Sequence, residues 1–147
     1  MPIDYSQPEW ETLFAHYGKT APAAQVLEKT LLLLLGCVHC RDKGEYVPGD
    51  LTAFLAKPKH KRMLVGQVIE ALKKKLPMSP DLATDLQKVF WQRNDVIHHF
   101  FLDSFDGQDW ARPPAQMDQE LKPIYLRLKR LQDSVNALLE QIQREVA

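Results

Sequence analysis

The segment MDQELKPIYLRLKRLQDSVNALLEQI, residues 117–142, sets the fold class. Its apolar residues alternate spacings of four and three, the 3.5-residue period of a helix packed lengthwise in a bundle or coiled coil. These residues are Met117, Leu121, Ile124, Leu128, Leu131, Val135, Leu138 and Ile142. Pro123 lies inside the pattern, so the helix is expected either to kink there or to begin there.

Prolines divide the remaining chain into helix-sized segments, and no segment shows a sustained apolar–polar alternation of period two. Ser6 is the expected cap of a first helix that ends at Gly18, and Thr20 is the expected cap of a second. Ser79, before Pro80, is the expected cap of the helix at residues 80–104. Expected helices cover residues 6–17, 21–40, 63–76 and 80–104, with a short helical turn at 50–56. We therefore predict an all-α protein: a single domain over residues 1–147, built as an up-and-down bundle of four to five helices.

The composition is that of an ordinary globular protein, with 45% hydrophobic and 26% charged residues. Net charge is zero, so any contact with nucleic acid needs a local basic patch. The longest apolar run, Leu31 to Val38, is much shorter than the roughly 20 residues that span a bilayer. The first residues are not expected to form a secretory signal. The expected location is the cytoplasm, without a membrane partner.

A polar cluster interrupts the helix expected at residues 80–104. Between Gln92 and His99, only Val96 and Ile97 are apolar. On a helical wheel Arg93 falls at the centre of the apolar stripe. Glu28 takes the same position in the helix expected at 21–40. Because an isolated buried charge is very costly, we expect Glu28 and Arg93 to approach each other or share a polar pocket.

The run Arg93-Asn94-Asp95-Val96-Ile97-His98 resembles the R-x4-6-H motif of the HEPN superfamily. The resemblance implies a helical bundle that forms a homodimer, with two motif copies facing one cleft. Many members are metal-independent ribonucleases of toxin–antitoxin or phage-defence systems, and others bind RNA or nucleotides without cutting. A cognate antitoxin, such as a nucleotidyltransferase, is a further partner that the resemblance implies.

The residue types suit RNA cleavage by the substrate's own 2′-hydroxyl, without a metal or cofactor. His98 would act as general acid and base, because an imidazole titrates near neutrality. Arg93 would hold the phosphate and stabilise charge in the transition state, with Asn94 orienting either group. Glu28 would position Arg93. Asp95 lies one helical turn before His99 and would hold that second imidazole.

The spacing leaves a geometric question, because residues five apart on a regular helix point about 140° away from each other. Either the helix deviates locally, the long Arg93 side chain bends round to His98, or the site combines side chains of two subunits. A polar packing network at a subunit interface is the alternative to a catalytic role for the cluster.

Basic residues gather in Lys57-Pro58-Lys59-His60-Lys61-Arg62, and a second run covers Lys73 to Lys75. We predict RNA contacts for Lys59, Lys61 and Arg62, with solvated helix ends as the alternative.

Metal and redox sites are not expected. Cys37 and Cys40 lack the second ligand pair of a structural zinc site, and a helix C-terminus does not activate a thiol, so buried inert cysteines are favoured. His98 and His99 diverge on a helix and would not easily chelate one ion. Trp10, Trp91 and Trp110 are interpreted as core or interface residues.

The leading hypothesis is a homodimeric, metal-independent endoribonuclease of toxin or defence type. The alternative is a non-catalytic helical module that binds RNA, a nucleotide or another protein, with a structural Arg93–Glu28 pair.

Overall fold

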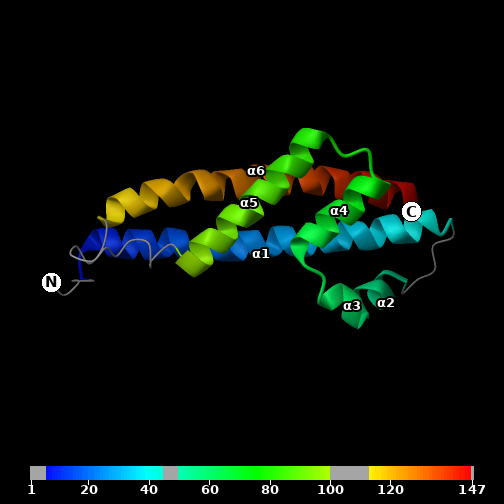
Figure 1. The fold of residues 1–147 in the computed structure, drawn as a ribbon, viewed down its shortest axis with the longest axis horizontal. Coiled ribbons are helices and arrows are strands. Elements are labelled where there is room, and N and C mark those ends of the chain that lie inside the picture. The colour runs from blue at the N-terminus through cyan, green and yellow to red at the C-terminus, as the bar shows by residue number, and fades with distance from the viewer. Residues whose placement is uncertain (1–5, 45–49, 100–112, 147) are drawn as a thin grey trace. The chain divides into compact units, whose positions relative to one another are not determined.

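The computed structural model describes residues 6–44, 50–99 and 113–146, without the side chains of Lys61, residues 97–99 and Val146. The described residues form helices and no strand, which confirms the all-α class (Figure 1). The helices are α1 (Pro8–Asp42), α2 (Asp50–Ala56), α3 (Pro58–Lys61), α4 (Val65–Lys75), α5 (Pro80–His99) and α6 (Pro114–Val146). The finer prediction, a HEPN-like bundle of four to five helices in one domain, stays a prediction.

Helix α1 is continuous over 35 residues, so the predicted break at Gly18 was wrong. The Thr20 hydroxyl does not cap a new helix but donates back to the His16 carbonyl at 2.9 Å. Pro22 is accommodated inside the helix although an interior proline costs about 3 kcal/mol. The apolar stripe explains this result, because it continues across the expected break. Its buried members are Leu13, Ala24, Leu27, Leu31, Leu34 and Val38.

Helix α6 carries the predicted apolar period without interruption. It begins at Pro114 and continues through Pro123, so Pro123 is not its start. Burial follows the spacing of four and three, because Met117, Leu121, Leu128, Leu131, Val135 and Ile142 are buried. Ile124 and Leu138 are half-buried.

The described residues belong to two compact units, and α1, α5 and α6 each contribute to both. Unit 1 combines residues 1–25 with 88–129, and unit 2 combines residues 26–87 with 130–147. The core of unit 1 joins α1, α5 and α6. It contains Trp10, Leu13, Val96, Met117 and Leu121, with Tyr17 and Ile124 packed against it.

Within each unit, α1 and α6 run in the same direction. In unit 2, the amide of Gln132 donates to Thr30 at 2.9 Å, and further along both helices Arg41 contacts Glu145 at 3.4 Å. In unit 1, the corresponding contact joins His16 and Asp118.

Helix α5 runs opposite to α6 in unit 1. Val96 packs in the core with Met117 near the start of α6, whereas Gln92 accepts a hydrogen bond from Arg127 further along α6. The direction of α5 can be followed in Figure 1. Ser79 caps this helix as predicted, since its hydroxyl accepts the Leu82 amide at 3.1 Å.

Helix α2 packs closely against α1 in unit 2. Gly36 is buried, and a Cβ added there would lie 2.6 Å from Leu51 Cδ1 and 3.1 Å from Phe54 Cδ1. The Phe54 ring stacks on His60 with centroids 3.8 Å apart and lies 5.0 Å from the His39 ring. Glycine at position 36 therefore makes room for the short helix α2.

By length and composition, α1 could cross a membrane. The same criteria are met by the core helix of a soluble protein, and α1 buries residues in both units. The feature is therefore weak evidence for a membrane span.

Candidate functional site

The motif residues of α5 lie in unit 1, at the edge of its core. Val96 is 5% exposed and anchors the helix. Arg93 is half-buried, with its guanidinium carbon 5.6 Å from the centroid of the buried Phe90 ring. Asn94 and Asp95 are exposed. Arg93 thus packs beside an apolar ring but is only half-buried, less than its predicted place at the centre of the apolar stripe implied, while Asn94 and Asp95 face solvent.

Helix α5 continues through His99, so the predicted catalytic His98 is on the same helix as Arg93. The side chains of His98 and His99 lie outside the described residues. Their predicted roles, and the predicted contact of Asp95 with His99, stay predictions.

Glu28, the predicted partner of Arg93, is half-buried on the part of α1 that belongs to unit 2. Arg93 belongs to unit 1. The Glu28–Arg93 pair stays a prediction.

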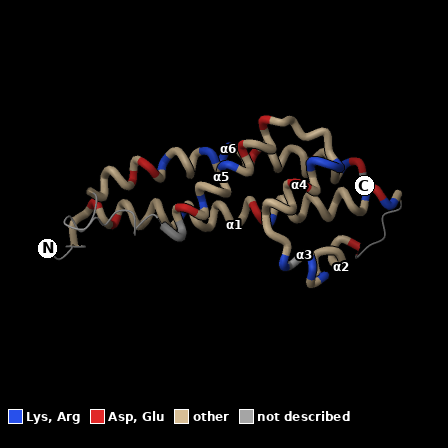
Figure 2. The backbone as a smooth tube through the Cα atoms, viewed as in Figure 1, with Lys and Arg blue, Asp and Glu red and all other residues tan. Residues whose placement is uncertain are grey.

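The predicted RNA-binding residues lie on and after α3, in unit 2. Lys59 and Arg62 are exposed, whereas the Lys61 side chain lies outside the described residues. His60 is 6% exposed, and its Nδ1 is hydrogen-bonded to the Phe54 carbonyl, so packing occupies it. Figure 2 shows basic residues on α3 and at the end of α4. Exposed cations are thus available in unit 2 for phosphate contacts.

The lysines at the end of α4 are partly neutralised. Lys73 lies 3.4 Å from Glu70, and Lys75 lies 3.5 Å from Asp42. Such exposed pairs contribute little stability. This arrangement fits the solvated helix end that was the alternative for this run.

Cys37 and Cys40 are buried free thiols, as predicted. Burial raises the pKa of both thiols, and Cys40 adds to the effect at Cys37. The pKa of His39 is lowered by burial and by Lys43, Lys57, Lys75 and His60. Raised thiol pKa values disfavour the reactive thiolate. In the described part of the chain, no group of three or more His, Cys, Asp or Glu is placed to hold a metal ion.

An unpredicted hydrogen-bonded pair joins His16 of α1 to Asp118 of α6 in unit 1. The carboxylate of Asp118 accepts a hydrogen bond from His16 Nδ1 and is 3.7 Å from Lys122 Nζ. Asp118 is only 8% exposed, and a carboxylate is rarely buried to this extent unless it is paired. The two residues are 102 positions apart, so no local pattern could have paired them. The sequence signal for a polar contact at this place was Asp118 itself, a carboxylate that directly follows Met117 of the apolar repeat.

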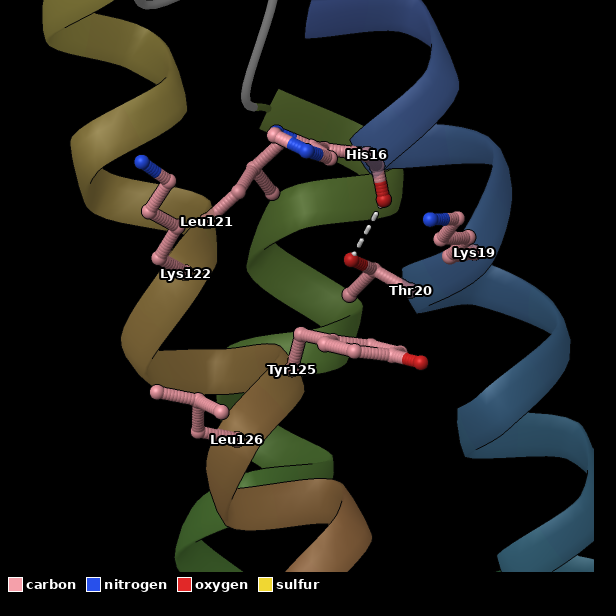
Figure 3. A pocket seen from close by; sticks show the side chains of 7 residues that line it. All are labelled: His16, Lys19, Thr20, Leu121, Lys122, Tyr125 and Leu126. Carbon is pink, nitrogen blue, oxygen red and sulfur yellow. Dashed lines mark hydrogen bonds between the residues drawn. The ribbon is translucent and has the colours of Figure 1, made fainter.

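A pocket of about 290 Å³ opens beside this pair (Figure 3). It is lined by His16, Lys19, Thr20, Leu121, Lys122, Tyr125 and Leu126. All of these residues belong to unit 1 and come from α1 and α6. The pocket therefore combines an imidazole and two ammonium groups with apolar walls.

The tryptophans have different environments. Trp10 is a core residue at 7% exposure, as interpreted, whereas Trp91 is 70% exposed on α5. Trp110 lies outside the described residues. Trp91 is therefore not a core residue, and the interface interpretation of it stays a prediction.

Comparisons with protein-family models, curated proteins and solved structures found no match for this chain.

Proposed function

We propose that this protein is a metal-independent endoribonuclease of toxin or defence type. Arg93 holds the scissile phosphate and His98 transfers protons during attack by the 2′-hydroxyl, as in the chemistry inferred for the motif. Asn94 orients one of these groups. The RNA substrate is cytoplasmic, and a cognate antitoxin such as a nucleotidyltransferase controls the activity.

The observation that carries the proposal is the solvent exposure of the motif's polar side chains. Asn94 and Asp95 are exposed, and Arg93 is half-buried at the boundary between the Phe90 ring and solvent. A network that served only the core of this unit would bury these groups and satisfy them internally. Their exposure leaves them available to a substrate or a second subunit.

A homodimer reconciles the spacing of Arg93 and His98. On a regular helix, position 98 follows Trp91 by two turns and shares its face, which points away from that of Arg93. Trp91 is 70% exposed, and aromatic residues are enriched in protein interfaces. A homodimer in which two motif copies face one cleft would let Arg93 of one subunit act with His98 of the other, and the exposed Trp91 is a candidate contact residue of this dimer.

The first experiment measures cleavage of a fluorescently labelled RNA in EDTA. Wild-type protein and the control Arg130→Ala, which removes an exposed arginine, should both cut. Arg93→Ala and His98→Ala should remain folded by circular dichroism and lose activity by at least about a hundredfold, the scale of a lost acid–base or charge-stabilising group. A wild-type protein that never cuts, or variants that cut normally, would refute the proposal.

The second experiment tests whether two subunits share the site. Inactive Arg93→Ala and His98→Ala proteins are mixed under conditions that exchange subunits. Half of the dimers then contain both variants, and each has one intact site, so about a quarter of wild-type activity should return. No recovery, with exchange verified by mass, would show that each site is formed within one subunit.

The packing of Arg93 against Phe90 also favours a second candidate, a non-catalytic RNA-binding, nucleotide-binding or protein-interaction module. In this case Arg93 would have a structural role with Glu28. Arg93→Ala would then lower the free energy of unfolding by about 3–5 kcal/mol, as expected for a broken buried pair. Denaturant unfolding of the same variant separates the two candidates.

A further inference from the structure

The pocket of unit 1 has an apolar body and a basic rim. Leu121, Leu126 and the Tyr125 ring supply apolar surface, and Leu126 remains 63% exposed at the pocket. Lys19 lines it from α1 and Lys122 from α6, and Figure 3 shows the Lys122 ammonium on the side of α6 away from α1. Ligand pockets commonly have this division between apolar walls and a few charged groups.

The electrostatic balance of the rim favours an anion. Asp118 is the carboxylate beside the pocket, and it is engaged by both His16 and Lys122. Among the residues that the structure describes, Lys19 has no ion-pair partner. Counted together, Lys19, Lys122 and Asp118 leave a net positive charge around the pocket even with a neutral His16. A third cation, Lys129, lies 5.7 Å from the centroid of the Tyr125 ring.

The walls favour a flat ligand. Tyr125 and His16 each present a half-buried ring to the pocket. Planar ring systems gain from stacking or edge contacts with such side chains. The hydroxyl of Thr20 already donates to the His16 carbonyl, so it keeps only its acceptor capacity for a ligand.

The position of His16 is set by its partner. Asp118 accepts the hydrogen bond from Nδ1, which leaves Nε2 as the other polar atom of the ring. Because the buried carboxylate holds the imidazole in one orientation, the His16 ring has a fixed position beside the cavity. The pair thus builds a defined polar edge into an otherwise apolar pocket.

We propose that this pocket binds a small planar aromatic anion, with its ring against Tyr125 and its acidic group at Lys19. The anion is either the phosphate of a nucleotide or the carboxylate of an aromatic acid. The site uses neither Arg93 nor His98, so it is independent of the ribonuclease proposal.

Isothermal titration calorimetry tests this with adenosine monophosphate and naphthalene-2-carboxylate, each beside its neutral counterpart, adenosine or naphthalene-2-carboxamide. At least one anion should bind saturably, and its neutral counterpart should bind at least about tenfold more weakly, since a charge-assisted contact is lost. Which of the two anions binds shows whether the acidic group of the ligand is the phosphate of a nucleotide or the carboxylate of an aromatic acid. Failure of both anions, or equal binding of the neutral compound, would overturn the proposal.

Variants locate the binding. Lys19→Ala should weaken binding by about tenfold or more, and Tyr125→Leu should weaken it while retaining an apolar side chain. The control Lys88→Ala removes an exposed lysine of the same unit and should bind like wild type. Arg93→Ala should also bind like wild type, which separates this result from loss of RNA cleavage. Unchanged binding by the folded pocket variants would overturn the assignment.

A measurement on the wild-type protein removes the dependence on variant folding. The backbone amide signals of Lys19 and Tyr125 should shift in nuclear magnetic resonance spectra as the bound anion is added. A titration in which the shifts occur only elsewhere in the chain would place the ligand outside this pocket and refute the assignment.

Discussion

Gly18 and Gly36 of α1 should respond oppositely to the same substitution by alanine. Both lie inside the helix, where replacing glycine by alanine gains about 1 kcal/mol of helix propensity. A Cβ at Gly18 meets no atom within 4 Å, so Gly18→Ala should raise the free energy of unfolding by about 1 kcal/mol. This variant is the matched control.

At Gly36 the same gain is opposed by steric overlap with α2. The added Cβ would lie 2.6 Å from Leu51 Cδ1, so the two helices or the leucine side chain must shift. Overpacking of this kind costs about 1–3 kcal/mol. Gly36→Ala should therefore range from neutral to about 2 kcal/mol destabilising, which leaves it about 1–3 kcal/mol below Gly18→Ala.

Urea unfolding followed by helical circular dichroism measures both variants. Gly36→Ala is also made together with Leu51→Ala, which removes the nearest clashing atom. The substitution at Gly36 should then destabilise less than it does in the wild-type background, giving a measurable coupling energy. If Gly18→Ala and Gly36→Ala stabilise equally and show no coupling with Leu51, the close approach of α2 to α1 is wrong.

Three further predictions concern local groups. Ser79→Ala should lower the free energy of unfolding by about 1 kcal/mol by removing the cap of α5, measured by urea unfolding; an unchanged midpoint would contradict that cap. The pKa of His39 is lowered from 6.5, so the unfolded state binds more protons below that pH. Stability should be retained above about pH 6.5 and fall as pH drops through the folded pKa, and a pH series should show a weaker fall for His39→Gln. The buried thiols of Cys37 and Cys40 should react slowly with iodoacetamide until urea is added, as followed by mass spectrometry; rapid reaction of the folded protein would contradict their burial.

Sequence was sufficient where the determining interactions were local or periodic. The repeat from Met117 to Ile142 predicted the buried face of α6, and Ser79 predicted the start of α5. The short helix Asp50–Ala56 was also predicted with its observed bounds. In these cases one apolar face or one hydrogen bond determines the structure.

Sequence failed where packing outweighed a local signal. Gly18 and Pro22 indicate a helix end, yet burial along α1 keeps the helix continuous. The contact of His16 with Asp118 joins residues 102 positions apart and leaves no local pattern. For the candidate site, the wheel placed Arg93 at the centre of the apolar stripe, whereas the structure has it half-buried beside Phe90. The wheel gave no information on the pocket lined by His16 and Tyr125.

The parallel course of α1 and α6 has a consequence during synthesis on the ribosome. The apolar run from Leu31 to Val38 emerges about a hundred residues before the segment of α6, from residue 130 onward, that belongs to the same unit. The core of this unit cannot be completed until that segment leaves the exit tunnel, and contacts so distant in sequence form slowly. The nascent chain therefore carries an exposed leucine-rich helix for most of its translation, which makes it a natural client of the chaperones that bind apolar segments.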